Sequence, residues 1–205
     1  MKKLNATLKK NKMTEIAPRV ITLGDSGVGK TSLIYRMKTG TFLEETSPTI
    51  GAGVTAVEVT IKAQTFPLQI WDTAGQEMYR NIIPIYFKGA VFAILVFAMD
   101  DKRSFDSLNS WLDEIEAHSD PNIGIVLVGN KYDSDNKVID DDTARVYAAE
   151  HGLHIFFSSA LTGQNVSEIL NYIAIENSKR AELMRVPTPG MPERREKGDK
   201  DSKCC

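Results

Sequence analysis

The stretch that most constrains this chain is Gly24-Asp25-Ser26-Gly27-Val28-Gly29-Lys30-Thr31, which fits the pattern G-x-x-x-x-G-K-[ST]. It follows a short apolar run over residues 20–23 and precedes a helical pattern of apolar residues. A strand, a glycine loop and a helix in this order form a phosphate cradle, because backbone N–H groups and the positive end of the helix dipole converge on an anion. We expect Lys30 to reach the outer phosphates and the Thr31 hydroxyl to bind Mg²⁺. The alternative is a surface turn with a solvated lysine, and the flanking strand and helix argue against it.

The composition is that of a soluble globular protein, since 42% of the 205 residues are hydrophobic and 25% are charged. The net charge of −2 argues against a nucleic-acid partner held by bulk charge. The longest apolar run, Ala90 to Met99, is about half the length of a membrane span and predicts a strand buried on both faces. Both cysteines, Cys204 and Cys205, come last, so we expect no disulfide within the fold and a reducing cytosol around it.

Changes of composition divide the chain into three segments. Residues 1–17 carry five lysines among few apolar residues and predict a flexible basic arm; the alternative to a solvated arm is a weak contact with a membrane or a partner. Residues 18–180 alternate strand and helix patterns and predict the folded domain. Residues 181–205 are rich in proline and then in charges of both signs, which predicts a flexible tether that ends in Cys204 and Cys205.

Strand patterns that alternate with helix patterns predict an α/β fold, with a mostly parallel sheet and helices on both faces. The strand patterns cover residues 20–23, 57–61, 66–71, 90–99, 123–128 and 155–157. We expect irregular backbone over residues 41–53, which are rich in turn residues, and over residues 76–88, where Pro84 interrupts any long helix. Apolar residues from 105 to 115 predict one continuous helix. In such a fold the ligand binds at the carboxyl ends of the strands.

A second motif, Trp71-Asp72-Thr73-Ala74-Gly75-Gln76-Glu77, directly follows a strand pattern. The Asp72 carboxylate at that edge is suited to hold Mg²⁺ through water, and Gly75 lets its backbone N–H approach a phosphate. Gln76 is suited to orient an attacking water. An ordinary turn that contains an aspartate is the alternative interpretation.

A third motif, Asn130-Lys131-Tyr132-Asp133, follows the buried strand pattern over residues 123–128. Asp133 can accept from both N1–H and the 2-amino group of guanine, whereas adenine lacks both donors and would leave the carboxylate unpaired. The aliphatic stem of Lys131 is suited to cover the face of the base. Polar loops supply such tetrads by chance, so this signal gains its strength from the phosphate loop upstream.

Two weaker signals complete the set. Ser158-Ser159-Ala160 follows the last strand pattern, where backbone N–H groups are expected to meet an oxygen of the base. Thr49, in the irregular segment, is a candidate for a second hydroxyl ligand of Mg²⁺. Neither signal would carry weight by itself.

Taken in order, G-D-S-G-V-G-K-T, P-T-I-G, W-D-T-A-G-Q-E, N-K-x-D and S-A resemble the motifs of the small GTPases of the Ras superfamily, over Pro18 to Lys179. Residues 68–77, residues 86–90 and the terminal Cys-Cys resemble the Rab branch. The resemblance implies a P-loop NTPase G domain whose six-stranded sheet has one antiparallel edge strand. It also implies a GTP hydrolase that acts as a monomeric molecular switch between GTP and GDP forms.

The resemblance further implies which residues contact the nucleotide. Thr31, Thr49 and Asp72 would hold Mg²⁺, Gln76 would be the catalytic residue that positions water, and Phe42 would pack against guanine. Thr49 and Gly75 would sense the γ-phosphate, so residues 42–53 and 74–88 would be the two switch loops. The residues expected to bind GTP or GDP are Asp25, Ser26, Gly27, Val28, Gly29, Lys30, Thr31, Ser32, Phe42, Thr49, Asp72, Gly75, Asn130, Lys131, Asp133, Ser159, Ala160 and Leu161.

The Rab-like features imply a role in vesicle and membrane traffic. An exchange factor, a GTPase activator, a GDP-dissociation inhibitor and effectors would bind through the switch loops. Prenyl groups on Cys204 and Cys205 would anchor the chain to the cytoplasmic face of an intracellular membrane, from which it cycles to the cytosol, since one lipid alone anchors weakly. The alternatives are a P-loop ATPase or nucleotide kinase, a nucleotide-bound scaffold with little hydrolysis, and a Ras-superfamily GTPase outside the Rab branch.

The chain also departs from the Rab pattern. Gly53 and Val54 stand where an acidic and an aromatic residue are usual, so the aromatic triad that Rabs present to effectors would here be Val54, Trp71 and Tyr86, with one ring missing. Met78 replaces a usual arginine and Leu161 a usual lysine. None of these departures touches the chemistry of phosphate or Mg²⁺, and those at residues 53, 54 and 78 change the surface for partners.

Overall fold

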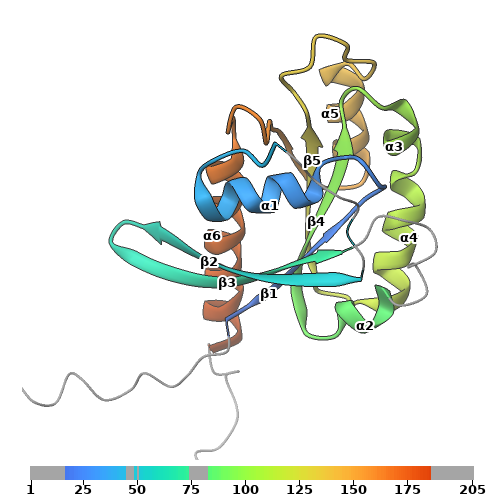
Figure 1. Ribbon diagram of the computed structural model, residues 1–205. Helices are drawn as coiled ribbons and strands as arrows, with labels where there is room; N and C mark the ends of the chain where they lie inside the picture. The colour runs from blue at the N-terminus through green and yellow to red at the C-terminus, as the bar shows by residue number, and fades with distance from the viewer. Residues whose placement is uncertain (1–16, 45–48, 50, 74–82, 186–205) are drawn as a thin grey trace, which may run out of the picture.

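One twisted sheet organises the molecule (Figure 1). The computed structural model describes residues 17–44, 49, 51–73 and 83–185. The strands of these residues are β1 (Arg19–Leu23), β2 (Ala52–Ile61), β3 (Gln64–Thr73), β4 (Ala90–Ala98), β5 (Gly124–Asn130) and β6 (His154–Phe157). The helices are α1 (Lys30–Thr39), α2 (Ile83–Phe87), α3 (Lys102–Asp106), α4 (Leu108–His118), α5 (Asp141–Glu150) and α6 (Val166–Arg185).

The strand order in the sheet is β2-β3-β1-β4-β5-β6, and all neighbours pair in parallel except β2 with β3. A tight turn joins that antiparallel pair, and its two residues, Lys62 and Ala63, have φ of 46° and 66°, the signs that hairpin turns require. The prediction of a mostly parallel six-stranded sheet with one antiparallel edge strand is therefore confirmed.

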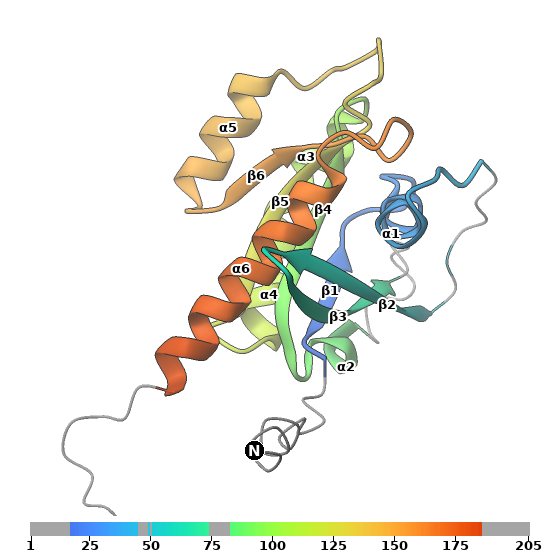
Figure 2. The ribbon, with the colours of Figure 1, turned by 90° about the vertical axis from the view of Figure 1, so that its left-hand side faces the viewer.

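Alternating side chains of the central strands build a core on each face of the sheet. Val20 of β1 joins the core under α1 and α6, whereas its neighbour Ile21 joins the core under α2, α4 and α5. Figure 2 shows α6 lying along the first face with α4 behind the sheet, and Figure 1 shows α5 on the same side of the sheet as α4. Burial on both faces explains why the sequence of β4 is a continuous apolar run. Among the described helices, none combines the length and apolar character needed to cross a membrane.

Three local expectations were wrong. β2 begins at Ala52, inside the segment expected to be irregular, because pairing of Ala52 with Thr73 extends the hairpin beyond its alternating apolar residues. A short helix, α2, lies within residues 76–88, and Pro84 fits as its second residue, where a backbone N–H has no partner inside a helix. The helix expected over residues 105–115 divides into α3 and α4 at Ser107, whose hydroxyl donates to Asp25 and to the carbonyl of Ser104.

The carboxyl ends of the parallel strands meet at one edge of the sheet, which assembles the loops that carry the motifs. The glycine loop follows β1, Asp72 is the last residue but one of β3, Asn130 ends β5 and residues 158–161 follow β6. The fold therefore brings together segments that are more than a hundred residues apart in the sequence.

Candidate functional site

A cavity of about 510 Å³ opens at this edge of the sheet. Most of the residues expected to bind a nucleotide line it, namely Ser26, Gly27, Gly29, Lys30, Thr31, Ser32, Phe42, Thr49, Asn130, Lys131, Asp133, Ala160 and Leu161. Three residues outside the set expected to bind a nucleotide, Thr73, Asp100 and Ser134, line it as well. Its size and its mixture of polar and apolar groups suit a ligand as large as a nucleotide.

The glycine loop leaves no room for side chains at two positions. Gly24 has a φ of 134°, and a Cβ there would lie 2.1 Å from the carbonyl oxygen of Val96. Gly29 has a φ of 92°, and a Cβ there would lie 2.4 Å from Nδ2 of Asn130. Glycine is needed at both positions because the backbone conformation is left-handed and the neighbours are close. The loop thus packs directly against β4 and the asparagine that ends β5.

Lys30 is the first residue of α1, and its side chain turns back over the glycine loop. Its Nζ donates to the carbonyl oxygens of Gly24 at 2.8 Å and Asp25 at 2.7 Å, and only 6% of the residue is exposed. Burial lowers the pKa of Lys30 to about 8, against the opposing attraction of Asp72 and Asp25. A buried cation held by two neutral carbonyls at the start of a helix is well placed to receive phosphate oxygens.

Thr31, Thr49 and Asp72, the residues expected to bind Mg²⁺, lie together beside Lys30. The Thr31 hydroxyl lies 2.7 Å from Oδ2 of Asp72 and 2.8 Å from the Thr49 hydroxyl, and the Thr49 hydroxyl lies 3.5 Å from the same carboxylate oxygen. Burial raises the pKa of Asp72, and its Oδ1 accepts no hydrogen bond from any described residue. Two hydroxyls and a buried carboxylate with a free oxygen are the hard oxygen donors that Mg²⁺ prefers, so these residues fit that ion.

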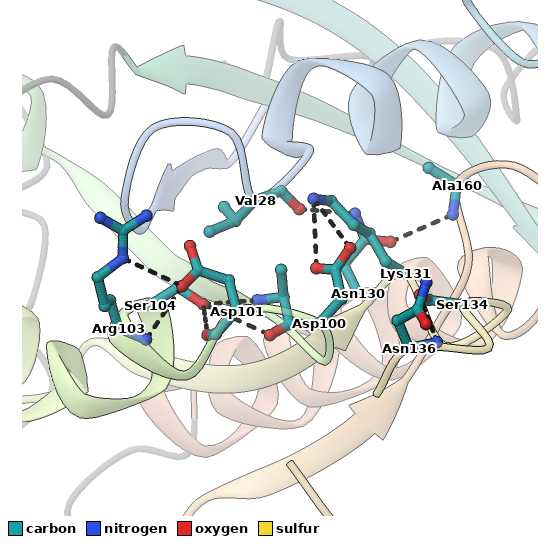
Figure 3. Close-up of polar contacts among 11 residues, drawn as sticks. Val28, Asp100, Asp101, Arg103, Ser104, Asn130, Lys131, Ser134, Asn136 and Ala160 are labelled. Carbon is teal, nitrogen blue, oxygen red and sulfur yellow. Dashed lines mark hydrogen bonds and ion pairs between the residues drawn. The ribbon is translucent and has the colours of Figure 1, made fainter. Parts of the chain in front are cut away.

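Asn130 connects the glycine loop to the loop after β6 (Figure 3). Its Nδ2 donates to the carbonyl of Val28 at 2.8 Å, and its Oδ1 accepts from the backbone N–H of Ala160 at 3.2 Å. The residue is 1% exposed, so each of these bonds replaces water that cannot reach it. Asn130 therefore positions other parts of the pocket and also lines the pocket wall.

Lys131 and Asp100 form an ion pair on the wall of the cavity (Figure 3). Nζ of Lys131 lies 3.3 Å from Oδ1 and 3.5 Å from Oδ2 of Asp100. Asp133 is exposed at the cavity, and its carboxylate accepts no hydrogen bond from the described part of the chain. Asp133 is therefore available to a ligand, while Lys131 already has a partner in the protein.

Four expected nucleotide-binding residues do not line the cavity. Asp25 turns toward α4, where Trp111 Nε1 and the Ser107 hydroxyl donate to its two oxygens, both at 2.8 Å. Val28 is fully buried in the core under α1. Asp72 lies behind Thr31, and Ser159 is fully buried, with its hydroxyl accepting from the N–H of Thr162.

The backbone N–H groups after β6 also have partners within the protein. The N–H of Ser158 donates to Gly129, that of Ser159 donates to Gln164, and that of Ala160 donates to Asn130. These bonds fix the shape of the loop at the base end of the cavity. Gly75, Gln76, Met78, Cys204 and Cys205 lie outside the described residues.

The three residues expected to correspond to the effector triad lie next to one another on β2, β3 and α2. Val54 of β2 pairs with Trp71 of β3, and the Trp71 and Tyr86 rings lie 6.0 Å apart. Val54 is 52% exposed, and the guanidinium of Arg19 lies 4.2 Å from the Trp71 ring centre. The three residues expected to form the triad therefore lie close together, and Val54 is aliphatic where the expected pattern has a ring.

One signal in the sequence points to the cavity residues that the motifs missed. Asp100 follows β4, and a polar residue just after a buried parallel strand lies at the ligand edge of the sheet. Thr73 belongs to the second motif, but its hydroxyl donates to the carbonyl of Thr22 at 2.5 Å and serves the structure. Ser134 directly follows the third motif. Strand position would therefore have identified Asp100.

The fold and the pocket together define a P-loop nucleotide-binding domain. Comparison with known families matches residues 19–179 to the Ras family. The chain therefore belongs to the Ras family of small GTPases, and it is a GTP hydrolase.

The relatives of this chain are Rab proteins. "Ras-related protein Rab5" of Nicotiana tabacum is 36% identical over 190 residues, which cover 91% of this chain and 94% of the relative. "Ras-related protein Rab-5A" of Dictyostelium discoideum is 40% identical over 157 residues, covering 76% and 78%. "GTP-binding protein ypt3" of Schizosaccharomyces pombe is 38% identical over 159 residues, covering 77% and 74%. The predicted resemblance to Rab small GTPases is confirmed.

Proposed function

We propose that this protein is a membrane-tethered switch for vesicle traffic, which alternates between a GTP form and a GDP form. The observation that carries the proposal is the pairing of two chemistries in one cavity. Lys30 and the cluster of Thr31, Thr49 and Asp72 suit the phosphates at one end, and the free carboxylate of Asp133 suits guanine at the other. A pocket with both ends binds a whole guanine nucleotide and discriminates it from adenine.

Thr31, Thr49 and Asp72 are the residues that would hold Mg²⁺. The ion supplies positive charge to the phosphate oxygens when it is bound. Asp72, whose Oδ1 accepts no hydrogen bond from the described residues, would hold the ion through its carboxylate, and Thr31 and Thr49 would hold it through their hydroxyls. Thr49 belongs to the segment over residues 42–53, so loss of the γ-phosphate would release that segment as a switch.

Hydrolysis in this proposal depends on positioning. Gln76 orients the attacking water, Lys30 holds the phosphates and the helix N-terminus stabilises their charge. Because the protein supplies little covalent chemistry, we expect slow turnover without a GTPase activator. A Gln76→Leu variant should lose most single-turnover GTP hydrolysis; equal rates for this variant and the parent would favour a nucleotide-bound scaffold instead.

The outer surface and the tail support the switch role. Effectors, an exchange factor, an activator and a GDP-dissociation inhibitor would bind the segments over residues 42–53 and 74–88, next to the exposed Val54 and the Trp71–Tyr86 pair. Residues 1–17 would remain a flexible arm, residues 18–180 the GTPase domain, and residues 181–205 a tether with prenyl groups on Cys204 and Cys205. The expected location is the cytoplasmic face of an intracellular membrane, in exchange with the cytosol.

Replacement of Asp133 tests the nucleotide assignment. In Asp133→Asn the two donors of guanine meet an amide instead of a carboxylate, so GTP affinity should fall by about 100-fold or more. Asp135→Asn is the matched control, because this exposed aspartate lies two residues away and does not line the cavity. GTP affinity measured by fluorescence of a labelled nucleotide decides the point: an unchanged preference for GTP over ATP in Asp133→Asn would contradict the assignment.

Removal of the last two residues tests the membrane part of the proposal separately. A fluorescently tagged chain without Cys204 and Cys205 should be diffuse in the cytosol, while the full chain marks an internal membrane. Membrane association that persists without the two cysteines would exclude the lipid anchor and leave the GTPase assignment intact.

A further inference from the structure

Arg36 makes three hydrogen bonds that the proposed nucleotide chemistry does not use. It lies in the last turn of α1, and its Nε donates to the carbonyl of Ala160 at 2.8 Å. One terminal nitrogen donates to the carbonyl of Leu161, and the other donates to the carbonyl of Gly40 at 2.6 Å. Figure 2 shows the loop after β6 lying beside α1, where these bonds form. The guanidinium of Arg36 on α1 thus holds two loops, one at Gly40 and one at Ala160, which are 120 residues apart in the sequence.

All three carbonyls belong to segments at the base end of the cavity. Ala160 and Leu161 line the cavity themselves. Gly40 ends α1, two residues before Phe42, which also lines the cavity. Arg36 itself does not line the cavity, so its effect on a ligand must act through these segments.

The geometry of these bonds requires arginine. A guanidinium is planar and has five N–H donors in a fixed arrangement, so it can serve three carbonyls that lie in different directions. A lysine ammonium in the same place is a point charge on a flexible stem and cannot match all three. The positive charge also lies at the carboxyl end of α1, where the helix dipole favours a cation. In return, the N–H of Gly40 donates to the Arg36 carbonyl at 2.9 Å, which closes the end of the helix.

The same helix connects both ends of the pocket. α1 begins at Lys30 and Thr31, at the phosphate end, and Arg36 lies six residues later, about 9 Å along the helix axis. A rigid helix that holds phosphates at its first turn and the base loop at its last turn fixes the distance between the two halves of the ligand site. Any opening of the base loop away from α1 must first break the bonds of Arg36 to Ala160 and Leu161.

We propose that Arg36 is a positioning residue that holds residues 160–161 against α1 and thereby sets how long a guanine nucleotide remains bound. The inference rests on the proposed guanine nucleotide site. It assigns the slow step of nucleotide release to opening of the loop after β6, and it assigns control of that step to a side chain outside the cavity.

The test is the dissociation rate of fluorescent GDP from Mg²⁺-loaded protein, measured after addition of excess unlabelled GDP. Arg36→Ala should release GDP about tenfold faster or more, because the charge-assisted hydrogen bonds to the carbonyls of Ala160 and Leu161 are lost. Arg36→Lys should release GDP almost as fast as Arg36→Ala, since lysine keeps the charge but lacks the planar set of N–H donors.

Arg180→Ala is the matched control. Arg180 lies on α6, donates to the carbonyl of Asn122 at 2.8 Å and covers the Phe92 ring at 4.8 Å, so it joins a helix to a loop far from the cavity. The Arg180→Ala variant should be less stable to denaturant but should release GDP at the rate of the parent protein. Equal acceleration in Arg36→Ala and Arg180→Ala would mean that release follows general destabilisation, and it would overturn the proposal.

Hydrogen exchange of GDP-loaded protein gives a second readout. In Arg36→Lys, amides over residues 158–165 should exchange at least about tenfold faster while those of α5 stay unchanged. GDP release and loop exchange that both equal the parent's would refute the role of Arg36 while leaving the nucleotide site in place. Failure of the parent itself to bind guanine nucleotide would refute the proposed function, and the inference with it.

Discussion

At the phosphate end of the pocket, the charged groups of Lys30 and Asp72 contact only backbone carbonyls and hydroxyls, whereas at the base end the amide of Asn130 is hydrogen-bonded to the protein through both its nitrogen and its oxygen. Lys30 has only neutral carbonyl partners, and Oδ1 of Asp72 has none among the described residues. Asn130, in contrast, donates to the glycine loop and accepts from the loop after β6. The two ends therefore differ in what completes their hydrogen bonding.

The pKa shifts of Lys30 and Asp72 also indicate that the charges at the phosphate end are incompletely compensated by the described residues. Burial lowers the pKa of Lys30 and raises that of Asp72, so both charged forms are disfavoured at the phosphate end. Phosphates and a divalent cation would supply the missing charge partners. We infer that the phosphate end contributes most of the binding free energy, while the base end is built in advance and contributes selectivity and residence time.

The largest effect should follow removal of the Lys30 charge. Lys30→Met keeps the apolar stem and removes the buried ammonium, so the phosphates lose their cation and GDP affinity should fall by about 4 kcal/mol, or nearly a thousandfold. Titration calorimetry measures this difference. A loss below tenfold would show that the phosphate end does not dominate binding.

The second-largest effect should be the change with pH in the free energy of unfolding of the nucleotide-free protein. Below pH 8 Lys30 is protonated in both the folded and unfolded chain, and its burial opposes folding. Between pH 8 and 10.5 the unfolded chain holds a proton that the folded chain has released, so stability rises with pH, by up to about 3 kcal/mol. Denaturant unfolding at several pH values should show this rise in the parent and lose it in Lys30→Met; parallel curves would argue against a desolvated lysine.

Breaking the base end should cost fold stability in addition to binding. Asn130→Ala leaves the Val28 carbonyl and the Ala160 N–H without their partners, and we expect a loss of about 2–3 kcal/mol in the free energy of unfolding. Asn136→Ala is the control, since that exposed residue lies outside the cavity wall. Denaturant unfolding of both variants decides whether the base end is as prebuilt as its hydrogen bonds indicate.

The smallest effect is expected for the ion pair of Asp100 and Lys131. Both side chains are partly exposed, at 28% and 38%, so solvent weakens their attraction. A double-mutant cycle of Asp100→Asn and Lys131→Ala on GDP affinity should give a coupling of about 0.5–1 kcal/mol. A coupling of zero would show that Lys131 acts on the base without help from Asp100.

The sequence predicted the parts of the site that carry their own motifs. The glycine loop, the gathering of the motifs at the carboxyl ends of the strands and the grouping of Thr31 with Asp72 follow from strands that each end in a motif, because such a motif is a local pattern with a fixed place in the fold. Arg36 escaped prediction because its partners are backbone carbonyls, which every residue possesses and no sequence pattern marks. Asp25 was predicted to bind the nucleotide because it lies in the motif, yet its carboxylate accepts from Ser107 and Trp111 and does not face the cavity.

Irregular segments were hardest to predict for a related reason. The extension of β2 to Ala52 depends on pairing with Thr73, and the division of α3 from α4 depends on Ser107, whose hydroxyl donates to Asp25 about eighty residues earlier. Both outcomes come from tertiary contacts that outweigh local propensity. The buried strands needed no such contact, because their apolar runs already indicate two covered faces.

Hydrogen exchange of the parent protein tests the difference between the two ends most directly. Amides are followed with GDP and Mg²⁺ bound and again after both are removed. We expect residues 24–31 to lose protection by about tenfold or more on removal, while residues 126–131 and 158–165 change little, because Asn130 and Arg36 hold them without a ligand. Equal loss of protection at both ends would contradict a base end that the protein builds in advance.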